Sequence, residues 1–338
     1  MAVRPLCIAR VLFLAFVLWR SMAIHPHHLG GICLVLFAAI TWSPLPAPAQ
    51  GLIDQDAVGD LLSRNRQALN ELPAVHYNYY VFGAEHTNTI VARQRLYRHL
   101  GDGDVTAGRR RARTVALLNR TTRRQFSVGD TLVVPTRFGL DFRAYSPFPR
   151  YYVGGHEKQK LLVLNKDMQG WAAYEYGRLE RWGIINTGAL ETPTPNGRFN
   201  VNWKEKKRLS SESPPGEEWW MYWVMNIHDG RGIHLHQYAM PTGGPTSHGC
   251  VRLVNSDANW LYGWTEAWET TANTSGSASR QGRLTDPGTM VLVLGEEPTG
   301  DPRPFRYKQR YPILRRVHLP AQPCDVPPGS PQQKRRSC

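Results

Sequence analysis

The spacing of apolar positions changes character along the chain. Between residues 51 and 72 apolar side chains recur at helical spacing, which predicts an amphipathic helix. Residues 75–90 are rich in aromatic and β-branched types, which predicts a strand or an extended loop. Residues 160–201 contain consecutive short apolar runs separated by Gly and Pro turns, and residues 288–294 form a closing apolar run. These patterns predict a mainly β (α+β) domain that follows a small α/β module.

The same patterns divide the chain into segments. We expect a small module at residues 50–136, a Pro- and Tyr-containing linker at 137–157, a β-rich domain at 158–296, and a flexible, Pro-rich basic tail at 297–338. Within the β-rich domain, the polar residues 204–216 predict either a surface loop or a lid over a site.

Residues 1–49 have the features of a targeting segment. Two apolar runs, at residues 11–19 and 32–42, are each too short to span a bilayer. Ala47-Pro48-Ala49 then gives a small-x-small pattern. We expect a secretory signal that is cleaved after Ala49, with an uncleaved anchor as the alternative, and therefore an exported protein of the periplasm or cell wall.

Cysteine usage agrees with export. Removing residues 1–49 would leave three of the five cysteines. Cys324 and Cys338 bracket a Pro-rich stretch and can close a loop in an oxidising compartment. Cys250 would then be the odd thiol, which makes it a candidate reactive group.

The formal net charge of +14 favours anionic partners. The basic runs lack a helix-turn-helix, zinc-finger or aromatic ribonucleoprotein pattern, so nucleic-acid recognition is not indicated. A solvated basic face is the simpler alternative.

Candidate chemistry concentrates in the stretch Thr-Ser-His-Gly-Cys-Val-Arg-Leu at residues 246–253. Here Cys250 lies between His248 and Arg252. A thiol becomes an effective nucleophile at neutral pH only when its pKa is lowered or a base takes its proton. An isolated Cys is more often a small buried hydrophobe, but this one has two charged or titratable companions, His248 and Arg252.

Two further histidines precede this stretch. His234 and His236 alternate in Gly-Ile-His-Leu-His-Gln-Tyr, which places both on one face of a predicted strand. The Pro- and Gly-rich residues 241–245 would turn the chain back toward Cys250.

Ser247, His248, Gly249, Cys250 and Arg252, preceded by a histidine at short distance, resemble the signature of the L,D-transpeptidase catalytic domain of the YkuD type. A Thr-Pro-x-Gly-x-Phe sequence at residues 194–199 extends the resemblance to about residues 158–295. The resemblance implies a β-sandwich-like catalytic domain and an acyl-enzyme thioester on Cys250. It also implies peptidoglycan stem peptides as substrates, acylation by carbapenems, and no cofactor or metal.

Roles for the neighbouring residues follow from the resemblance. His236 is the first choice as general base because of its His-x-Tyr spacing, and His234 is the alternative. His248 would support the site, and Gly249 would allow close backbone approach, with its N–H and that of Cys250 as an oxyanion hole. Arg252 would hold a substrate carboxylate or form a structural ion pair. The candidate substrate-binding residues are Arg252, Ser247 and Tyr238.

Alternatives remain open at this point. His228, His234, His236, His248 and Cys250 are potential zinc ligands, although no His-Glu-x-x-His helix or Cys-x-x-Cys pair accompanies them. A zinc or thiol peptidase or carboxypeptidase, or a non-catalytic wall-binding protein, would use the same fold. The partner is peptidoglycan in each case, with an outer-membrane lipoprotein as another acceptor.

Two further expectations concern the flanking regions. Residues 115–135, with a short helix, a Gly-Asp turn and a strand that ends at Pro135, resemble the closing half of a LysM glycan-binding module. No opening half is evident, so a generic α/β spacer is the alternative. The aromatic run at residues 219–223 is expected to pack as core, with a substrate platform as the alternative.

Overall fold

The computed structural model describes residues 51–62, 66–271, 282–300, 302, 304–336 and 338. Residues Pro48–Cys338 form one compact unit. The predicted signal segment and its cleavage after Ala49 lie outside the described residues. Within the described residues, no helix combines the length and apolar character needed to cross a membrane.

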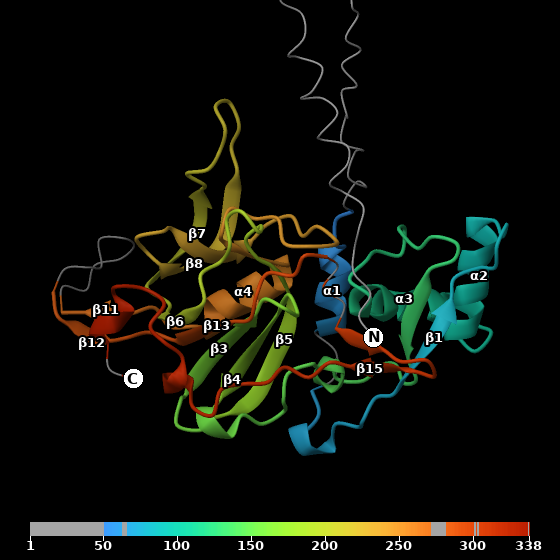
Figure 1. The fold of residues 1–338 in the computed structure, drawn as a ribbon, viewed down its shortest axis with the longest axis horizontal. Helices are drawn as coiled ribbons and strands as arrows, with labels where there is room; N and C mark the ends of the chain where they lie inside the picture. Colours follow the sequence, from blue (N-terminus) through green and yellow to red (C-terminus); the bar gives the residue numbers. More distant parts are fainter. Residues whose placement is uncertain (1–50, 63–65, 272–281, 301, 303, 337) are drawn as a thin grey trace, which may run out of the picture. The chain divides into compact units, whose positions relative to one another are not determined.

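In the N-terminal part of this unit, two helices follow each other in the sequence between two strands that pair with each other, and the helices lie beside these strands (Figure 1). Its elements are α1 (Gln55–Leu62), η1 (Leu69–Glu71), β1 (Tyr77–Val81), α2 (Thr89–Leu100), α3 (Val105–Leu118) and β2 (Thr131–Pro135). β1 and β2 pair antiparallel, from Tyr77 opposite Pro135. Asn88 and Asp104 begin α2 and α3 because their side chains accept hydrogen bonds from free backbone N–H groups of the first turn.

The predicted second half of this module is present: α3, a turn, and a strand that ends at Pro135. Strand β1 lies within residues 75–90, where a strand or extended loop was predicted, whereas helix α2 is the element that the sequence pattern did not reveal. Helix α2 is strongly basic and buries only part of its surface, through Leu96, Leu100 and two neighbours. The likeness to a LysM module stays a prediction.

The C-terminal part is built on a single nine-stranded sheet, which confirms the mainly β fold class. The strand order is β6-β13-β3-β4-β5-β10-β9-β8-β7. Its strands are β3 (Lys160–Asn165), β4 (Gly170–Glu175), β5 (Arg178–Asn186), β6 (Gly197–Asn200), β7 (Trp203–Leu209), β8 (Trp220–His228), β9 (Ile233–Gln237), β10 (Val251–Leu253) and β13 (Met290–Leu294). A separate small pair is formed by β11 (Glu269–Thr270) and β12 (Leu284–Asp286).

Both faces of the central strands are buried. In β3, Leu161 and Val163 belong to one apolar core, while Leu162 and Leu164 belong to the core on the other face. The second core also contains residues of helix α4 (Asn255–Trp264), which packs near the sheet (Figure 1). Burial on two faces explains why β3 has a continuous apolar run in the sequence and not an alternating one.

The segment 137–157, expected to be a linker, packs against the sheet. Phe142, in η2 (Phe142–Tyr145), stacks on Trp182 with ring centroids 4.7 Å apart, and its carbonyl accepts a hydrogen bond from the Trp182 indole. Phe148 is fully buried. A short turn, η3 (Val153–Gly155), leads into β3.

The tail also departs from expectation, because its described residues pack as defined structure and not as a flexible extension. It contains β14 (Phe305–Tyr307), β15 (Pro312–Leu314), η5 (Pro323–Asp325) and η6 (Gln333–Arg335). Phe305, Val317 and Val326 are buried in the first core. Cys324 and Cys338 form a disulfide.

Candidate active site

The loop that carries Cys250 lies between two parallel strands. β9 and β10 pair with Val251 opposite Leu235 and Arg252 opposite His236. The turn at residues 241–245 therefore starts a crossover that brings β10 beside β9 in the same direction, and the two strands do not form a hairpin. Gly249 has a φ of +112°, a backbone conformation that favours glycine.

The structure brings His234, and not His236, to the thiol. The Nδ1 atom of His234 lies 3.7 Å from the Sγ atom of Cys250, and the same sulfur lies 3.5 Å from the carbonyl oxygen of Gly232. The Nδ1 atom of His236 instead lies 3.0 Å from the carbonyl oxygen of Gln237. The geometry thus reverses the order in which the motif spacing ranked the two histidines.

Burial sets the protonation of this pair. It lowers the pKa of His234 to about 3, with the nearby His236 and Arg208 acting in the same direction. Burial also raises the pKa of the Cys250 thiol, against a smaller opposite effect of Arg252. The resting pair at neutral pH is therefore a thiol beside a neutral imidazole, which is the state in which an imidazole can accept the thiol proton.

Hydrogen bonds fix the loop around Cys250. The Ser247 hydroxyl donates to the carbonyl of Cys250 and accepts from the N–H of Gly249 at 3.1 Å. Thr192 and Thr194 donate from their hydroxyls to the carbonyls of Ser247 and Gly249, both at 2.9 Å. The N–H of Gly249 therefore donates to Ser247 and is not free to donate to a substrate. Of the two N–H groups predicted to form an oxyanion hole, that of Cys250 remains a candidate.

We call the hydrogen bonds of Thr192 and Thr194 to the Cys250 loop the threonine clamp. A buried polar network, which was not predicted from the sequence, binds Thr194 of this clamp. The Glu297 carboxylate accepts hydrogen bonds from the Thr187 hydroxyl and the Thr194 N–H, and lies 3.5 Å from the Lys166 ammonium. Burial raises the pKa of Glu297, opposed by Thr187 and Lys166. No motif signals this role, because Glu297 lies three residues after the end of β13 and its three partners are scattered in the sequence.

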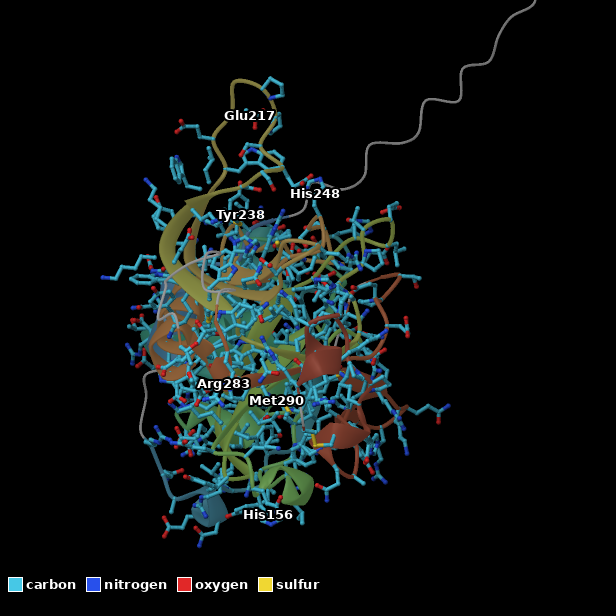
Figure 2. All side chains as sticks on the ribbon, turned by 90° about the vertical axis from the view of Figure 1, so that its left-hand side faces the viewer. His156, Glu217, Tyr238, His248, Arg283 and Met290 are labelled. Atoms are coloured by element: carbon cyan, nitrogen blue, oxygen red, sulfur yellow. A yellow bond between two sulfur atoms is a disulfide. The ribbon has the colours of Figure 1, made fainter. Side chains whose placement is uncertain are left out.

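Cys250 opens on a cleft of about 510 Å³. Arg252 lines this cleft with its guanidinium 5.0 Å from the centre of the Tyr238 ring, and no carboxylate of the described residues forms an ion pair with it. His248 is exposed and stacks on Trp219 at 5.9 Å. Figure 2 shows His248 and Tyr238 below the projecting loop that carries Glu217.

That projecting loop is the tip of the hairpin of β7 and β8. The expected lid or surface loop at 204–216 therefore begins as strand, and its end contributes Arg208 and Glu212 to the cleft. The expectation that residues 219–223 form core is wrong for most of them. Met221 is buried, but Tyr222 is exposed and Trp219 lines the cleft.

The zinc alternative requires at least three protein ligands around one point. Among the described residues, no group of three or more His, Cys, Asp or Glu side chains is arranged to hold a metal ion. His228 is turned to a different partner, since its Nδ1 accepts from the N–H of Arg231.

Comparison with known proteins agrees with this description of the fold. Residues 159–294 match the family model of the L,D-transpeptidase catalytic domain, YkuD. The resemblance inferred from the motif is thereby confirmed for this segment. A comparison with curated proteins gave no match.

Solved structures similar to the chain include an L,D-transpeptidase from Mycobacterium smegmatis, with 19% identity, a TM-score of 0.31, and coverage of 40% of this chain and 59% of that one. Another is an L,D-transpeptidase (Yku) from Stackebrandtia nassauensis, with 24% identity, a TM-score of 0.32, and coverage of 42% and 58%. The chain spans less than two thirds of the length of either structure.

Proposed function

We propose that the chain is an exported peptidoglycan L,D-transpeptidase that acts through a thioester on Cys250. The observation that carries the proposal is the 3.7 Å approach of His234 Nδ1 to Cys250 Sγ in a cleft of the domain that matches the family model. The disulfide in the tail is consistent with an oxidising compartment.

The proposed reaction has two steps. His234 takes the Sγ proton, and the thiolate attacks a stem-peptide carbonyl that precedes a terminal D-Ala. The imidazolium then protonates the departing D-Ala amine, and the acyl group stays on Cys250 as a thioester. In the second step an amine of a neighbouring stem attacks the thioester, His234 takes the excess amine proton, and the released sulfur recovers a proton.

Other residues of the cleft have supporting roles in this proposal. The N–H of Cys250 would donate to the oxyanion of each tetrahedral intermediate. Arg252, which has no carboxylate partner among the described residues, would hold the donor carboxylate with Tyr238 as its platform. Ser247 would set the loop geometry, and His248 with Trp219 would line the entrance.

The test is intact mass spectrometry of the mature protein and of Cys250→Ala after incubation with a tetrapeptide-stem muropeptide and a chelator. We expect an acyl adduct or a cross-linked product with the wild type and neither with the variant. Activity that persists in Cys250→Ala and disappears with chelator would overturn the proposal in favour of a metal peptidase.

When a free amino acid and a lysine-containing lipoprotein peptide are added to the same incubation, the product also identifies the acceptor. A cross-linked dimer indicates a stem-peptide amine, an exchanged terminus indicates a free amino acid, a peptide-linked product indicates a lipoprotein lysine, and a shortened stem indicates water. A carbapenem gives a second probe, for which an unchanged mass would count against the acyl-enzyme.

A further inference from the structure

The C-terminal residues of the chain contact residues next to the candidate active site: Arg336 contacts Asn202, and Gln332 contacts Asp229. The disulfide between Cys324 and Cys338 closes a loop that contains η6, and the nearby Gly329 packs on β6, where an added Cβ on Gly197 would come within 2.4 Å of the Gly329 backbone. We call residues 330–338 the C-terminal anchor. Its Arg336 side chain is buried.

Arg336 is an unusual residue to bury. Burial lowers its pKa to about 10, and no carboxylate of the described residues pairs with it. Its guanidinium donates to the Oδ1 of Asn202 at 3.1 Å and to the carbonyl of Pro287 at 3.4 Å, and it lies 4.7 Å from the centre of the Trp268 ring. Burial of a cation without a carboxylate partner costs folding free energy, which these two hydrogen bonds and the ring contact offset in part.

The contact with Asn202 fixes the direction of a chain of amides. A guanidinium only donates, so the oxygen of Asn202 must face Arg336 and its Nδ2 must face away. That Nδ2 donates to the Oδ1 of Asn226 at 2.8 Å. Asn226 lies on β8 directly opposite His234 on β9 and lines the cleft.

A second series of contacts connects the C-terminal anchor to His234 through Asp229 and Trp203. Gln332 donates to the Oδ2 of Asp229 at 3.3 Å, and the indole of Trp203 donates to Oδ1 of the same carboxylate at 3.5 Å. The Trp203 ring packs edge-on against His234, with centroids 5.1 Å apart.

His234 depends on such neighbours for its orientation. Its Nε2 atom is buried and has no hydrogen-bond partner among the described residues, so no side chain fixes the ring from that side. The ring packs edge-on against Trp203, lies opposite Asn226 in the strand pair, and has the Gly232 backbone as a hydrogen-bond partner.

We propose that Arg336 is a positioning residue for His234, acting through Asn202 and Asn226, and that the C-terminal anchor is thereby part of the active-site framework. The inference rests on the proposed role of the Cys250–His234 pair. It does not depend on which substrate the pair acylates.

The experiment measures the rate of Cys250 alkylation by iodoacetamide as a function of pH, with mass spectrometry to locate the adduct. It compares the wild type with Arg336→Met, the conservative Arg336→Lys, and the matched control Lys334→Met, an exposed position of the same turn. Thermal unfolding of each variant reports whether it is folded.

We expect Arg336→Met to slow alkylation at pH 7 by about tenfold, because a displacement of a reacting group by about 1 Å can cost about 10²-fold in rate and a smaller displacement costs less. The midpoint of the pH profile should rise, since the thiolate loses its imidazole neighbour. Arg336→Lys should restore part of the rate, and Lys334→Met should match the wild type. A wild-type rate and profile in folded Arg336→Met would overturn the inference.

If Arg336→Met does not fold, Asn202→Asp decides the question. Aspartate keeps an acceptor for Arg336 but cannot donate to Asn226, so we expect the same loss of alkylation rate. A wild-type rate would refute the proposed positioning of His234 through Asn202 and Asn226. Because alkylation needs no stem peptide, these results stand even if the muropeptide experiment shows no transpeptidation.

Discussion

His234 and His236 lie two residues apart on β9, yet only His234 contacts the thiol, so their replacements should differ. We expect His234→Gln to lower the rate of Cys250 acylation by about 10²- to 10⁴-fold, the usual contribution of a general base. His236→Gln, the matched control, should change the rate far less, because the His236 ring is directed to the Gln237 carbonyl. Single-turnover acylation measured by mass spectrometry checks both. A larger loss in His236→Gln would restore the ranking given by the motif.

The sequence could not separate these two histidines. Strand periodicity predicts that both share a face, and in the structure both are buried there. What distinguishes them is the stagger of β10, which places Arg252 opposite His236 and the Cys250 loop beyond the strand end, near His234. The register of β10 depends on the crossover between β9 and β10 and on the hydrogen bonds of Thr192 and Thr194 to the Cys250 loop. Both involve residues that are distant in the sequence, so the pattern around the two histidines does not predict them.

The buried histidines also predict a pH dependence of stability. Burial lowers the pKa of His236 to about 4, whereas an unfolded histidine titrates near 6.5. Between these values the unfolded state binds a proton that the native state does not, so stability falls as the pH decreases from about 6.5 toward 4 and is insensitive to this group above 6.5. The Tm of His236→Gln should therefore decline less than that of the wild type over this range. Parallel Tm curves would contradict the argument.

At the scale of elements, the tip of the hairpin of β7 and β8 contacts the Cys250 loop through the stack of Trp219 on His248. Trp219→Ala removes the stack on His248, worth about 0.5–1.5 kcal/mol, and should raise the KM for a stem peptide about two- to tenfold with a smaller change in kcat. Trp220→Ala is the control, because Trp220 contacts Lys207 and does not line the cleft. Steady-state kinetics distinguishes the two, and an equal effect of both variants would argue against a specific contact.

The Glu297 network also connects separate elements, because Glu297, which follows β13, binds Thr187 and Thr194, which follow β5. Glu297→Gln leaves the buried Lys166 without its counter-charge and should cost about 3 kcal/mol of unfolding free energy. The neighbouring Glu296 is exposed, so Glu296→Gln should change stability by less than about 0.5 kcal/mol. Denaturant unfolding measures both values. The network would be only peripheral if the two variants unfold alike.

At the scale of the whole molecule, the segment that matches the family model was predictable from the sequence, and the structure of the flanking segments was not. Pro-rich composition suggested a linker at 137–157 and a flexible tail, but composition does not register that Phe142, Phe148 and Phe305 meet apolar partners distant in the sequence. Such partners exist only once the nine-stranded sheet is assembled. The motif around Cys250 was readable because its spacing is local.

The disulfide tests whether the end of the chain contributes to the whole molecule beyond packing. In a protein expressed from residue 50 with Cys324→Ser and Cys338→Ser, Cys250 is the single cysteine, so its reactivity can be followed without interference. Loss of a cross-link that closes a loop of this size should lower the unfolding free energy by about 3 kcal/mol, since the unfolded chain gains conformational freedom. Because Arg336 precedes Cys338 by two residues, the same variant should also alkylate Cys250 more slowly at a temperature where it is fully folded. A lower free energy of unfolding with an unchanged alkylation rate would show that the disulfide stabilises the fold but does not restrain the candidate active site. A decrease in both quantities would show that the C-terminal anchor affects the position of His234.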